Sequence, residues 1–274
     1  MRMLFFFAVG MALMAIGMLY FGQANLIYFP QRYASNSKNL EKVASVHYVS
    51  GGRKQWAYVP KRERDSPPDR IWWFFGGNGS VAWNWIDLVG SVDPQINQDF
   101  ILFDYPGYGF NQGKPSPKSI ARSIDDSLPV LAEYLGLEVE ELLGRSRSVG
   151  HSLGAAIAFD LGSRHGVDTV VAISPFTKME DMAKRQMGPV LGMLLSHRYD
   201  NESSIDAMLL RDEVSITIFH GDQDRLIPHQ MGKDLSRRDT GGEGTVRFVS
   251  VSGAGHNDIV GEIENQLIEM LETK

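Results

Sequence analysis

The hydrophobic pattern of the chain has two parts, one long uncharged run and, after it, short apolar segments that alternate with amphipathic ones. From Met3 to Gly22 no residue is charged, and about 20 helical residues at about 1.5 Å each span the roughly 30 Å of a bilayer core. The run predicts a single-pass transmembrane anchor over residues 1–22. A cleaved secretory signal is the alternative, because Arg2 forms a short basic leader.

The segment after this run connects it to a folded domain. Residues 23–42 contain Pro30, several Ser and Asn residues and little periodicity, which is typical of a tether. The domain itself is expected over residues 43–274. Basic residues stand on both sides of the apolar run, Arg2 before it and Arg32 after it. The positive-inside rule therefore gives no orientation, and an extracytoplasmic position of the domain stays open.

Within the domain, apolar runs of strand length alternate with longer segments of helical period. The first two runs flank the polar turn Ser50–Arg53 and predict a hairpin. Ile71–Phe75 is continuously apolar, as expected for a parallel strand that is buried on both faces. Later strands are predicted at Phe100–Phe103, Val167–Ile173, Val214–Phe219 and Thr245–Val251, and helices at Ser119–Leu135 and Ile259–Leu271. This alternation predicts an α/β fold with a mostly parallel central sheet and helices on both faces.

Composition restricts the chemistry that such a fold can carry here. The chain is 43% hydrophobic and 22% charged, which is ordinary for a globular protein. The formal net charge is -6 and the basic residues are scattered, so no nucleic-acid partner is expected. There is no cysteine, which removes disulfides, thiolate catalysis and cysteine-ligated zinc. The chemistry is therefore expected from Ser, His, Asp or Glu, without a metal or a cofactor.

The candidate nucleophile is Ser152, at the centre of the G-x-S-x-G pattern GHSLG at residues 150–154. This pattern can place a serine on a tight turn from a strand to a helix. The backbone of such a turn is strained, and a Cβ two residues before or after the serine would collide with it, so Gly150 and Gly154 are expected to be sterically required. The preceding strand, Arg145–Val149, carries two arginines, which are costly in a central strand unless they pair or reach solvent.

The glycine-rich loop after the aromatic strand is the candidate oxyanion hole. In Gly76–Ser80 the backbone can approach a ligand closely, and either Gly77 or Asn78 is expected to donate its N–H, together with the N–H of Leu153. The choice between Gly77 and Asn78 stays open. A phosphate-binding loop is excluded because no Lys-Ser or Lys-Thr pair follows the glycines.

Two later loops offer an acid and a base. The loop His220–Pro228 contains the carboxylates Asp222 and Asp224, and the loop after the last predicted strand contains His256. The order of a serine, an acid and a histidine along the chain is that of the α/β-hydrolases and differs from the order in the two large serine protease folds.

These ordered motifs resemble the α/β-hydrolase superfamily, and most nearly its small membrane-anchored serine hydrolases, which include protein-depalmitoylating α/β-hydrolase-domain enzymes. The resemblance rests on GHSLG, HGDQD, GAGHND and DYPGYGFNQGKPS, covers roughly residue 43 to the C-terminus, and extends to the LIYFP segment before it. It implies the α/β-hydrolase fold, with Ser152 as nucleophile, His256 as base and Asp224 as acid. Asp224 is preferred to Asp222 because the family pattern H-G-x-x-D has its acid at this position.

The segment 176–212 between two predicted strands carries helical signals of its own and predicts a small helical lid. Its methionines, Met179, Met182, Met187 and Met193, either line a site for an acyl chain or pack on the core. We expect a serine hydrolase that cleaves acyl ester or thioester bonds through an acyl-enzyme, on a lipid-like or acylated substrate. An aminopeptidase-like hydrolase and a catalytically silent binding protein of the same fold are the alternatives. The oligomeric state is left open.

Overall fold

The computed structural model describes residues 2–34, 37–62, 66–189, 192, 194–238 and 244–273. Its strands are β1 Val43–Ser50, β2 Arg53–Pro60, β3 Arg70–Phe75, β4 Gln98–Phe103, β5 Ser146–His151, β6 Thr169–Ile173, β7 Ser215–Gly221 and β8 Thr245–Val251. They form an eight-stranded sheet in the order β1-β2-β4-β3-β5-β6-β7-β8. Pairing is parallel from β4 through β8 and antiparallel between β1, β2 and β4. The predicted parallel sheet, entered by an antiparallel hairpin, is confirmed.

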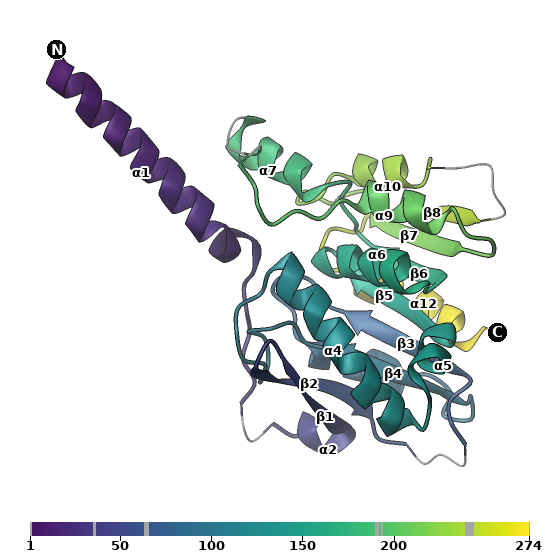
Figure 1. Ribbon diagram of the computed structural model, residues 1–274. Helices are drawn as coiled ribbons and strands as arrows, with labels where there is room; N and C mark the ends of the chain where they lie inside the picture. The colour runs from purple at the N-terminus through teal and green to yellow at the C-terminus, as the bar shows by residue number, and fades with distance from the viewer. Residues whose placement is uncertain are drawn as a thin grey trace.

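Helices cover both faces of this sheet, as predicted. They are α1 Arg2–Ile27, α2 Asn39–Lys42, η1 Ala82–Trp85, α3 Ile86–Gly90, α4 Pro117–Leu135, α5 Val139–Gly144, α6 Leu153–His165, α7 Met179–Met187, α9 Asn201–Met208, α10 His229–Leu235, α11 Ile259–Glu262 and α12 Glu264–Glu272. The core on one face contains side chains of α4, α6 and α9, and the core on the other contains side chains of η1, α3, α11 and α12. Figure 1 shows α4 and α6 on one face of the sheet and α12 on the other.

Strand β3 shows why the sequence predicts a doubly covered sheet. Trp73 and Phe75 belong to the core beneath α4 and α6, whereas Trp72 and Phe74 belong to the core beneath α3 and α12. Successive side chains of a strand point to opposite faces of the sheet. A strand that is covered on both faces therefore has no position from which a side chain reaches solvent. The continuous apolar run from Ile71 onward is the result, and each of its side chains is buried.

Strand β5, which leads to Ser152, accommodates the two arginines that precede it in the sequence. Arg145 lies just before the strand and pairs with Glu141 at 3.4 Å. Arg147 lies in the strand, and its guanidinium stacks over the ring of Trp72, 5.5 Å from the centroid. The strand begins at Ser146, one residue later than predicted, so only one arginine enters the sheet and its charged group is not left unpaired.

Helix α1 covers the run that was predicted to span a membrane, and it projects away from the sheet (Figure 1). Many of its side chains, including those of residues 3–5, lie outside the described residues. Across the part of the chain that the structure describes, no helix is long and apolar enough to cross a membrane. The predicted transmembrane helix is therefore not confirmed. Its last turn, from Gln23 to Ile27, packs against the domain, because Gln23 is buried and Ile27 joins the core beneath α4 and α6.

The segment after α1, predicted to be a tether, is fastened to the domain. We call residues 28–33 the strap. Tyr28 is 2% exposed and belongs to the core, and Tyr33 stacks on Trp83 with ring centroids 3.5 Å apart. Between them, the carbonyl of Gln31 accepts a hydrogen bond of 2.8 Å from the N–H of Gly109. The strap thus lies across the loops that follow β3 and β4.

The segment 176–212, predicted to form a lid, divides into two parts in the structure. We call residues 176–200 the cap segment; it contains α7, and residues 190, 191 and Met193 lie outside the described residues. The remainder contains α9, whose Ile205 and Met208 are fully buried in the core with α6. Met179, Met182 and Met187 of α7 line a cavity, and Met182 also belongs to the core, so the two expectations for these methionines hold together. The lid itself stays a prediction.

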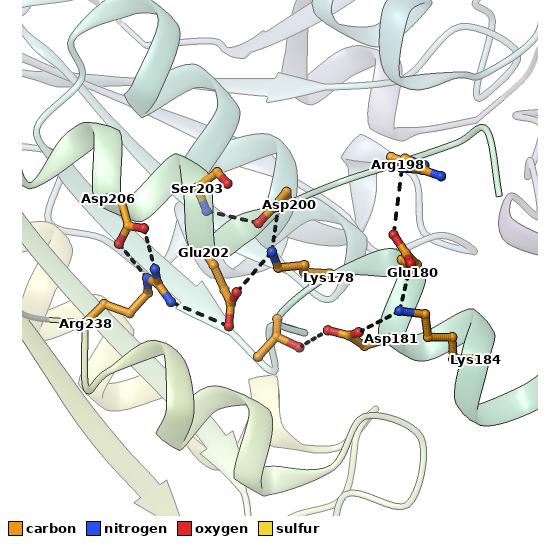
Figure 2. Close-up of polar contacts among 11 residues, drawn as sticks. Lys178, Glu180, Asp181, Lys184, Arg198, Asp200, Glu202, Ser203, Asp206 and Arg238 are labelled. Atoms are coloured by element: carbon orange, nitrogen blue, oxygen red, sulfur yellow. Dashed lines mark hydrogen bonds and ion pairs between the residues drawn. The ribbon is translucent and has the colours of Figure 1, made fainter. Parts of the chain in front are cut away.

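Charged residues connect the base of the cap segment to α9 and to the end of α10 (Figure 2). Lys178 lies 2.9 Å from Asp200 and 3.2 Å from Glu202. Glu202 is also 3.5 Å from Arg238, which pairs in addition with Asp206. Lys178 and Asp200, near the two ends of the cap segment, also form a β-bridge. The bridge and the ion pairs fix the base of the cap segment, that is, the two ends from which α7 extends.

Candidate active site

The turn between β5 and α6 holds Ser152 in a strained conformation. Its φ of 57° and ψ of -115° lie outside the regions that non-glycine residues ordinarily adopt. A Cβ on Gly150 would overlap the carbonyl group of Gly154, and a Cβ on Gly154 would overlap the carbonyl group of Phe75. The prediction that both glycines are sterically required is confirmed, and the reason is the close approach of α6 to the sheet.

The structure brings Ser152, His256 and Asp224 together as a hydrogen-bonded series. The distance from Ser152 Oγ to His256 Nε2 is 3.0 Å, and His256 Nδ1 lies 2.7 Å from Asp224 Oδ2. An ionised carboxylate only accepts hydrogen bonds, so Nδ1 carries the proton and Nε2 is left to accept from the serine hydroxyl. The three residues follow β5, β8 and β7, whose carboxyl ends meet at one edge of the sheet.

Asp224 is held as an anion by several donors. Its Oδ1 accepts from the backbone N–H groups of Leu226 at 2.9 Å and Ile227 at 2.8 Å, and His220 Nε2 lies 3.3 Å from its Oδ2. Burial raises the pKa of Asp224, but hydrogen bonds from His220, His256 and Ile227 outweigh it and hold the pKa well below its usual range. The carboxylate therefore keeps its charge beside His256 throughout the neutral pH range.

Asp222, the alternative acid, does not reach His256. Its side chain is exposed, and Oδ1 accepts a hydrogen bond of 2.8 Å from the N–H of Gly253. This contact ties the loop after β7 to the loop after β8. Of the two carboxylates offered by the HGDQD motif, the structure places Asp224 against the histidine and uses Asp222 to hold the loops together.

Two further buried histidines, His151 and His220, contact this hydrogen-bonded series, although the sequence predicts no role for them in the site. His151 Nε2 lies 2.9 Å from the carbonyl oxygen of His256. Burial, with a smaller effect of His256, lowers the pKa of His151 to about 4, so the ring is neutral at neutral pH and its N–H donates to that carbonyl. His220, fully buried, lies 3.0 Å from the carbonyl of Ile227. In the sequence, only their positions point to the site: His151 directly precedes Ser152, and His220 is the first residue of HGDQD.

The glycine-rich loop after β3 lies against Ser152. A Cβ on Gly77 would lie 3.3 Å from His151 Nδ1 and 3.7 Å from Ser152 Cβ, so the loop approaches this closely because residue 77 has no side chain. Asn78 and Leu153 line the same cavity as Ser152. Within the described residues, no hydrogen bond occupies the backbone N–H of Asn78 or of Leu153.

Other parts of the chain hold this loop in place. The carbonyl of Asn78 accepts from the N–H of Phe29 at 2.9 Å and from the Tyr108 hydroxyl at 2.6 Å, and its side-chain amide donates to the carbonyl of Ile27 at 2.9 Å. The hydroxyl of Tyr105 donates to the carbonyl of Gly76 at 2.5 Å. The aromatic residues of the DYPGYG loop therefore support the glycine-rich loop from behind.

A cavity of about 320 Å³ opens beside Ser152. Met179, Met182 and Met187 line it from α7, and Leu26 and Ile27 line it from the last turn of α1. No charged side chain is among the described residues of its lining. The site thus combines a serine whose hydroxyl lies against a histidine with an apolar cavity of the size that small ligands occupy, about 300–1,000 Å³.

A profile of the Alpha/beta hydrolase family matches residues 74–211, just over half of the chain. The chain belongs to this family. Alpha/beta hydrolase domain-containing protein 17B of Xenopus tropicalis is 29% identical over 241 residues, which are 88% of this chain and 77% of that protein. Uncharacterized protein YfhR of Escherichia coli K12 is 26% identical over 220 residues, 77% of this chain and 73% of YfhR.

Among solved structures, this α/β-hydrolase resembles the esterase Pf2001 of Pyrococcus furiosus. The TM-score is 0.68 at 16% sequence identity, and the match covers 90% of this chain and 97% of the esterase. At this identity the likeness concerns the fold. The expected α/β-hydrolase fold and its central sheet are thereby confirmed, and the family is one of hydrolases.

Proposed function

We propose that this α/β-hydrolase is a serine hydrolase that cleaves acyl ester or thioester bonds through an acyl-enzyme. The observation that carries the proposal is the series of hydrogen bonds from Ser152 through His256 to Asp224, which opens into an apolar cavity. Nucleophile, base and a third group that orients the base are the parts that covalent catalysis by a serine requires.

Acylation begins when Ser152 Oγ attacks the carbonyl carbon of the substrate while its proton passes to His256 Nε2. The carbonyl oxygen becomes an oxyanion, and the N–H groups of Asn78 and Leu153 stabilise it; Asn78 is favoured over Gly77 because it lines the cavity. The intermediate then collapses, the bond to the leaving oxygen or sulfur breaks, and His256 returns the proton to that atom. The acyl group remains bound to Ser152 as an ester.

Deacylation repeats these steps with water as the nucleophile. His256 Nε2 takes a proton from the water, whose oxygen attacks the ester carbonyl, and the same two N–H groups stabilise the oxyanion. Collapse breaks the bond to Ser152 Oγ, which regains a proton from His256. The carboxylic acid leaves, and the enzyme returns to its initial state. Asp224 keeps its negative charge throughout and stabilises the imidazolium in both halves of the reaction.

The cavity supports an acylated or lipid-like substrate over the aminopeptidase alternative. An aminopeptidase binds a free ammonium group, for which a buried carboxylate is the usual partner. Among the described residues that line the cavity none is acidic, and α7 contributes three methionines. The cap segment is accordingly proposed to be the lid over the acyl group, with α7 as its lining helix.

Membrane attachment is a further part of the proposal, and it rests on the sequence. Residues 3–22 carry no charge, and a charged residue is what makes insertion of a helix costly. We propose that this run anchors the hydrolase to a membrane through its N-terminus. A substrate with a long acyl chain resides in membranes or on their surface, so an anchored enzyme meets it there.

Labelling with a fluorophosphonate probe tests the catalytic assignment and separates it from a silent binding protein. We expect labelling of the wild type, none of Ser152→Ala and little of His256→Ala.

Asp224→Asn is expected to lower kcat by about 10³–10⁴-fold, because the amide favours the wrong histidine tautomer. Asp222→Asn is the matched control two residues away, and it is expected to keep activity within about tenfold. Equal losses in the two Asn variants, or labelling that persists in Ser152→Ala, would contradict the assignment.

A further inference from the structure

The last turn of α1 forms part of the wall of the cavity that contains Ser152. Leu26 and Ile27 both line this cavity, although they lie more than a hundred residues before the serine in sequence. Leu26 is 53% exposed, so it lies at the edge of the cavity, where bulk solvent begins. Helix α1 therefore contributes to the substrate site itself.

Gln23, one helical turn before Leu26, ties this end of α1 to the cap segment. Its side chain is 5% exposed. Nε2 donates to the carbonyl of Leu194 at 2.9 Å, and Oε1 accepts from the N–H of Ser196 at 2.6 Å and from its hydroxyl at 3.0 Å. A buried amide with partners on both ends is costly to displace. The end of α1 and the cap segment, which both line the cavity, are thus hydrogen-bonded to each other.

The two walls of the cavity differ in how far they adapt to a ligand. The lining from α7 includes Met179, Met182 and Met187, and methionine is unbranched and adjusts its shape to its neighbours. The lining from α1 includes Leu26, a branched side chain on a turn that the hydrogen bonds of Gln23 hold in place. The lining from α1 is thus less adaptable than the methionines of α7. We therefore expect Leu26 to discriminate between acyl chains of different length.

We propose that Leu26 of α1 determines the length of the acyl chain that the site accepts. The inference rests on the proposed hydrolase function, in which the acyl group is bonded to Ser152 and lies in this cavity. Ser152 and Leu26 line the same cavity and Leu26 lies at its exposed edge, so an acyl chain that is bonded to Ser152 and extends out of the cavity passes Leu26. The substrate class is an acyl ester or thioester whose chain is long enough to reach this edge.

The lining favours an acyl chain as the occupant. Apart from Ser152 and Asn78, the polar side chains among the described residues of the lining are Gln23 and Gln186, and Gln23 already bonds to the cap segment. A sugar or a peptide would lose its hydrogen bonds to water on entering and find few partners. A methylene chain loses no hydrogen bonds, and burial of each CH₂ stabilises the complex.

The test uses the full-length protein in detergent micelles and the p-nitrophenyl esters of acetate, decanoate and hexadecanoate. Leu26→Trp narrows the edge of the cavity, and we expect kcat/KM for the decanoate to fall by at least about tenfold while the acetate changes by less than about twofold. Leu26→Ala opens the edge, and we expect the hexadecanoate to gain about tenfold relative to the decanoate. Asn25→Trp is the matched control, since Asn25 is an exposed neighbour on the same turn that does not line the cavity. We expect its kcat/KM values for the three esters to equal those of the wild type.

Fluorophosphonate labelling of every variant separates failure of this inference from failure of the proposed function. A wild type that does not label overturns the hydrolase function and, with it, the role of Leu26. Labelled Leu26 variants that keep the wild-type ratios, or that lose activity equally on all three esters, overturn the role of Leu26 alone. If Leu26→Trp neither folds nor labels, the ratio measured for Leu26→Ala decides.

Discussion

At the scale of single residues, the site depends on buried groups whose charge the fold controls. His151 is the clearest case, because it lies beside Ser152 in sequence and yet its ring nitrogen contacts the backbone of His256. With a pKa lowered to about 4, it serves as a neutral donor. A charged ring at this position would compete with His256 for the negative charge of Asp224, so its neutrality preserves the hydrogen-bonded series.

The low pKa of His151 predicts a pH dependence of stability. The unfolded chain binds a proton at this residue below about pH 6.5, whereas the folded protein binds it below about pH 4. The unfolded state therefore holds more protons in this window, and stability falls as the pH is lowered from about 6.5 to about 4, by on the order of 3 kcal/mol. Urea unfolding at several pH values is expected to show a smaller loss for His151→Gln, which keeps an N–H donor.

His47→Gln provides the control for this measurement. His47 is an exposed residue of β1, so its replacement is expected to leave the pH dependence of the wild type unchanged. If the free energies of unfolding of His151→Gln and the wild type run parallel across the window, the neutral, buried His151 is not the cause of the acid sensitivity.

At the scale of elements, the ion pairs of Figure 2 hold the cap segment at its base. Arg238, which follows α10, pairs with Asp206 and Glu202 of α9, and Lys178 of the cap segment pairs with the same Glu202. Exposed pairs taken singly contribute little, but charges that share partners restrict each other and lose less entropy on pairing. The network thus joins the cap segment and the adjacent α9 to the residues after α10.

Arg238→Ala is expected to lower the free energy of unfolding by about 1 kcal/mol at low ionic strength and by clearly less in about 1 M salt, where screening acts over about 3 Å. Arg237→Ala is the matched control, because its side chain is 62% exposed and it pairs only with Asp234, three residues away, among the described ion pairs. Urea unfolding at both ionic strengths measures the difference. Equal effects of the two substitutions would argue against a network.

At the scale of the whole molecule, the last turn of α1 and the strap are packed into the fold. The strap buries Tyr28 and stacks Tyr33 on Trp83, and the last turn of α1 lines the cavity. Burial of one large apolar side chain contributes about 1.5–3 kcal/mol, which is a large fraction of the 5–15 kcal/mol that typically separates folded from unfolded chains. The residues before Val43, where the domain was predicted to begin, therefore contribute to the stability of the fold.

Two deletions separate the roles of this region. Removal of residues 2–21 is expected to release the protein from the membrane fraction of a cell lysate and to keep ester hydrolysis within about twofold, because Gln23 and Leu26 remain. Removal of residues 2–42 is expected to abolish hydrolysis and to give insoluble protein. Full-length protein found in the soluble fraction would contradict the anchor. Wild-type activity of the longer deletion would contradict the role of the strap.

The sequence by itself predicted the α/β fold with a mostly parallel sheet and the need for Gly150 and Gly154, whereas the order of the strands within the sheet came from the structure. The two predictions follow from local rules, since a strand buried on both faces is apolar throughout and a tight turn excludes a Cβ. The order of motifs along the chain pointed to Ser152, His256 and an acid after a late strand, and the resemblance to the α/β-hydrolases favoured Asp224 as that acid. Periodicity and short motifs can be recognised without the structure because they depend on residues that are near one another in sequence.

Only the tertiary structure decided which groups from distant segments meet. It placed Asp224 and not Asp222 against His256, assigned α7 to the cavity and α9 to the core, and brought Leu26 to the site of Ser152. Each outcome depends on the direction in which a loop or helix leaves the sheet, and packing over long separations in the chain sets that direction. The strap has the composition of a tether, but Tyr33 stacks on Trp83 and the hydroxyl of Tyr28 is hydrogen-bonded to that of Tyr199. Only the folded domain provides these partners.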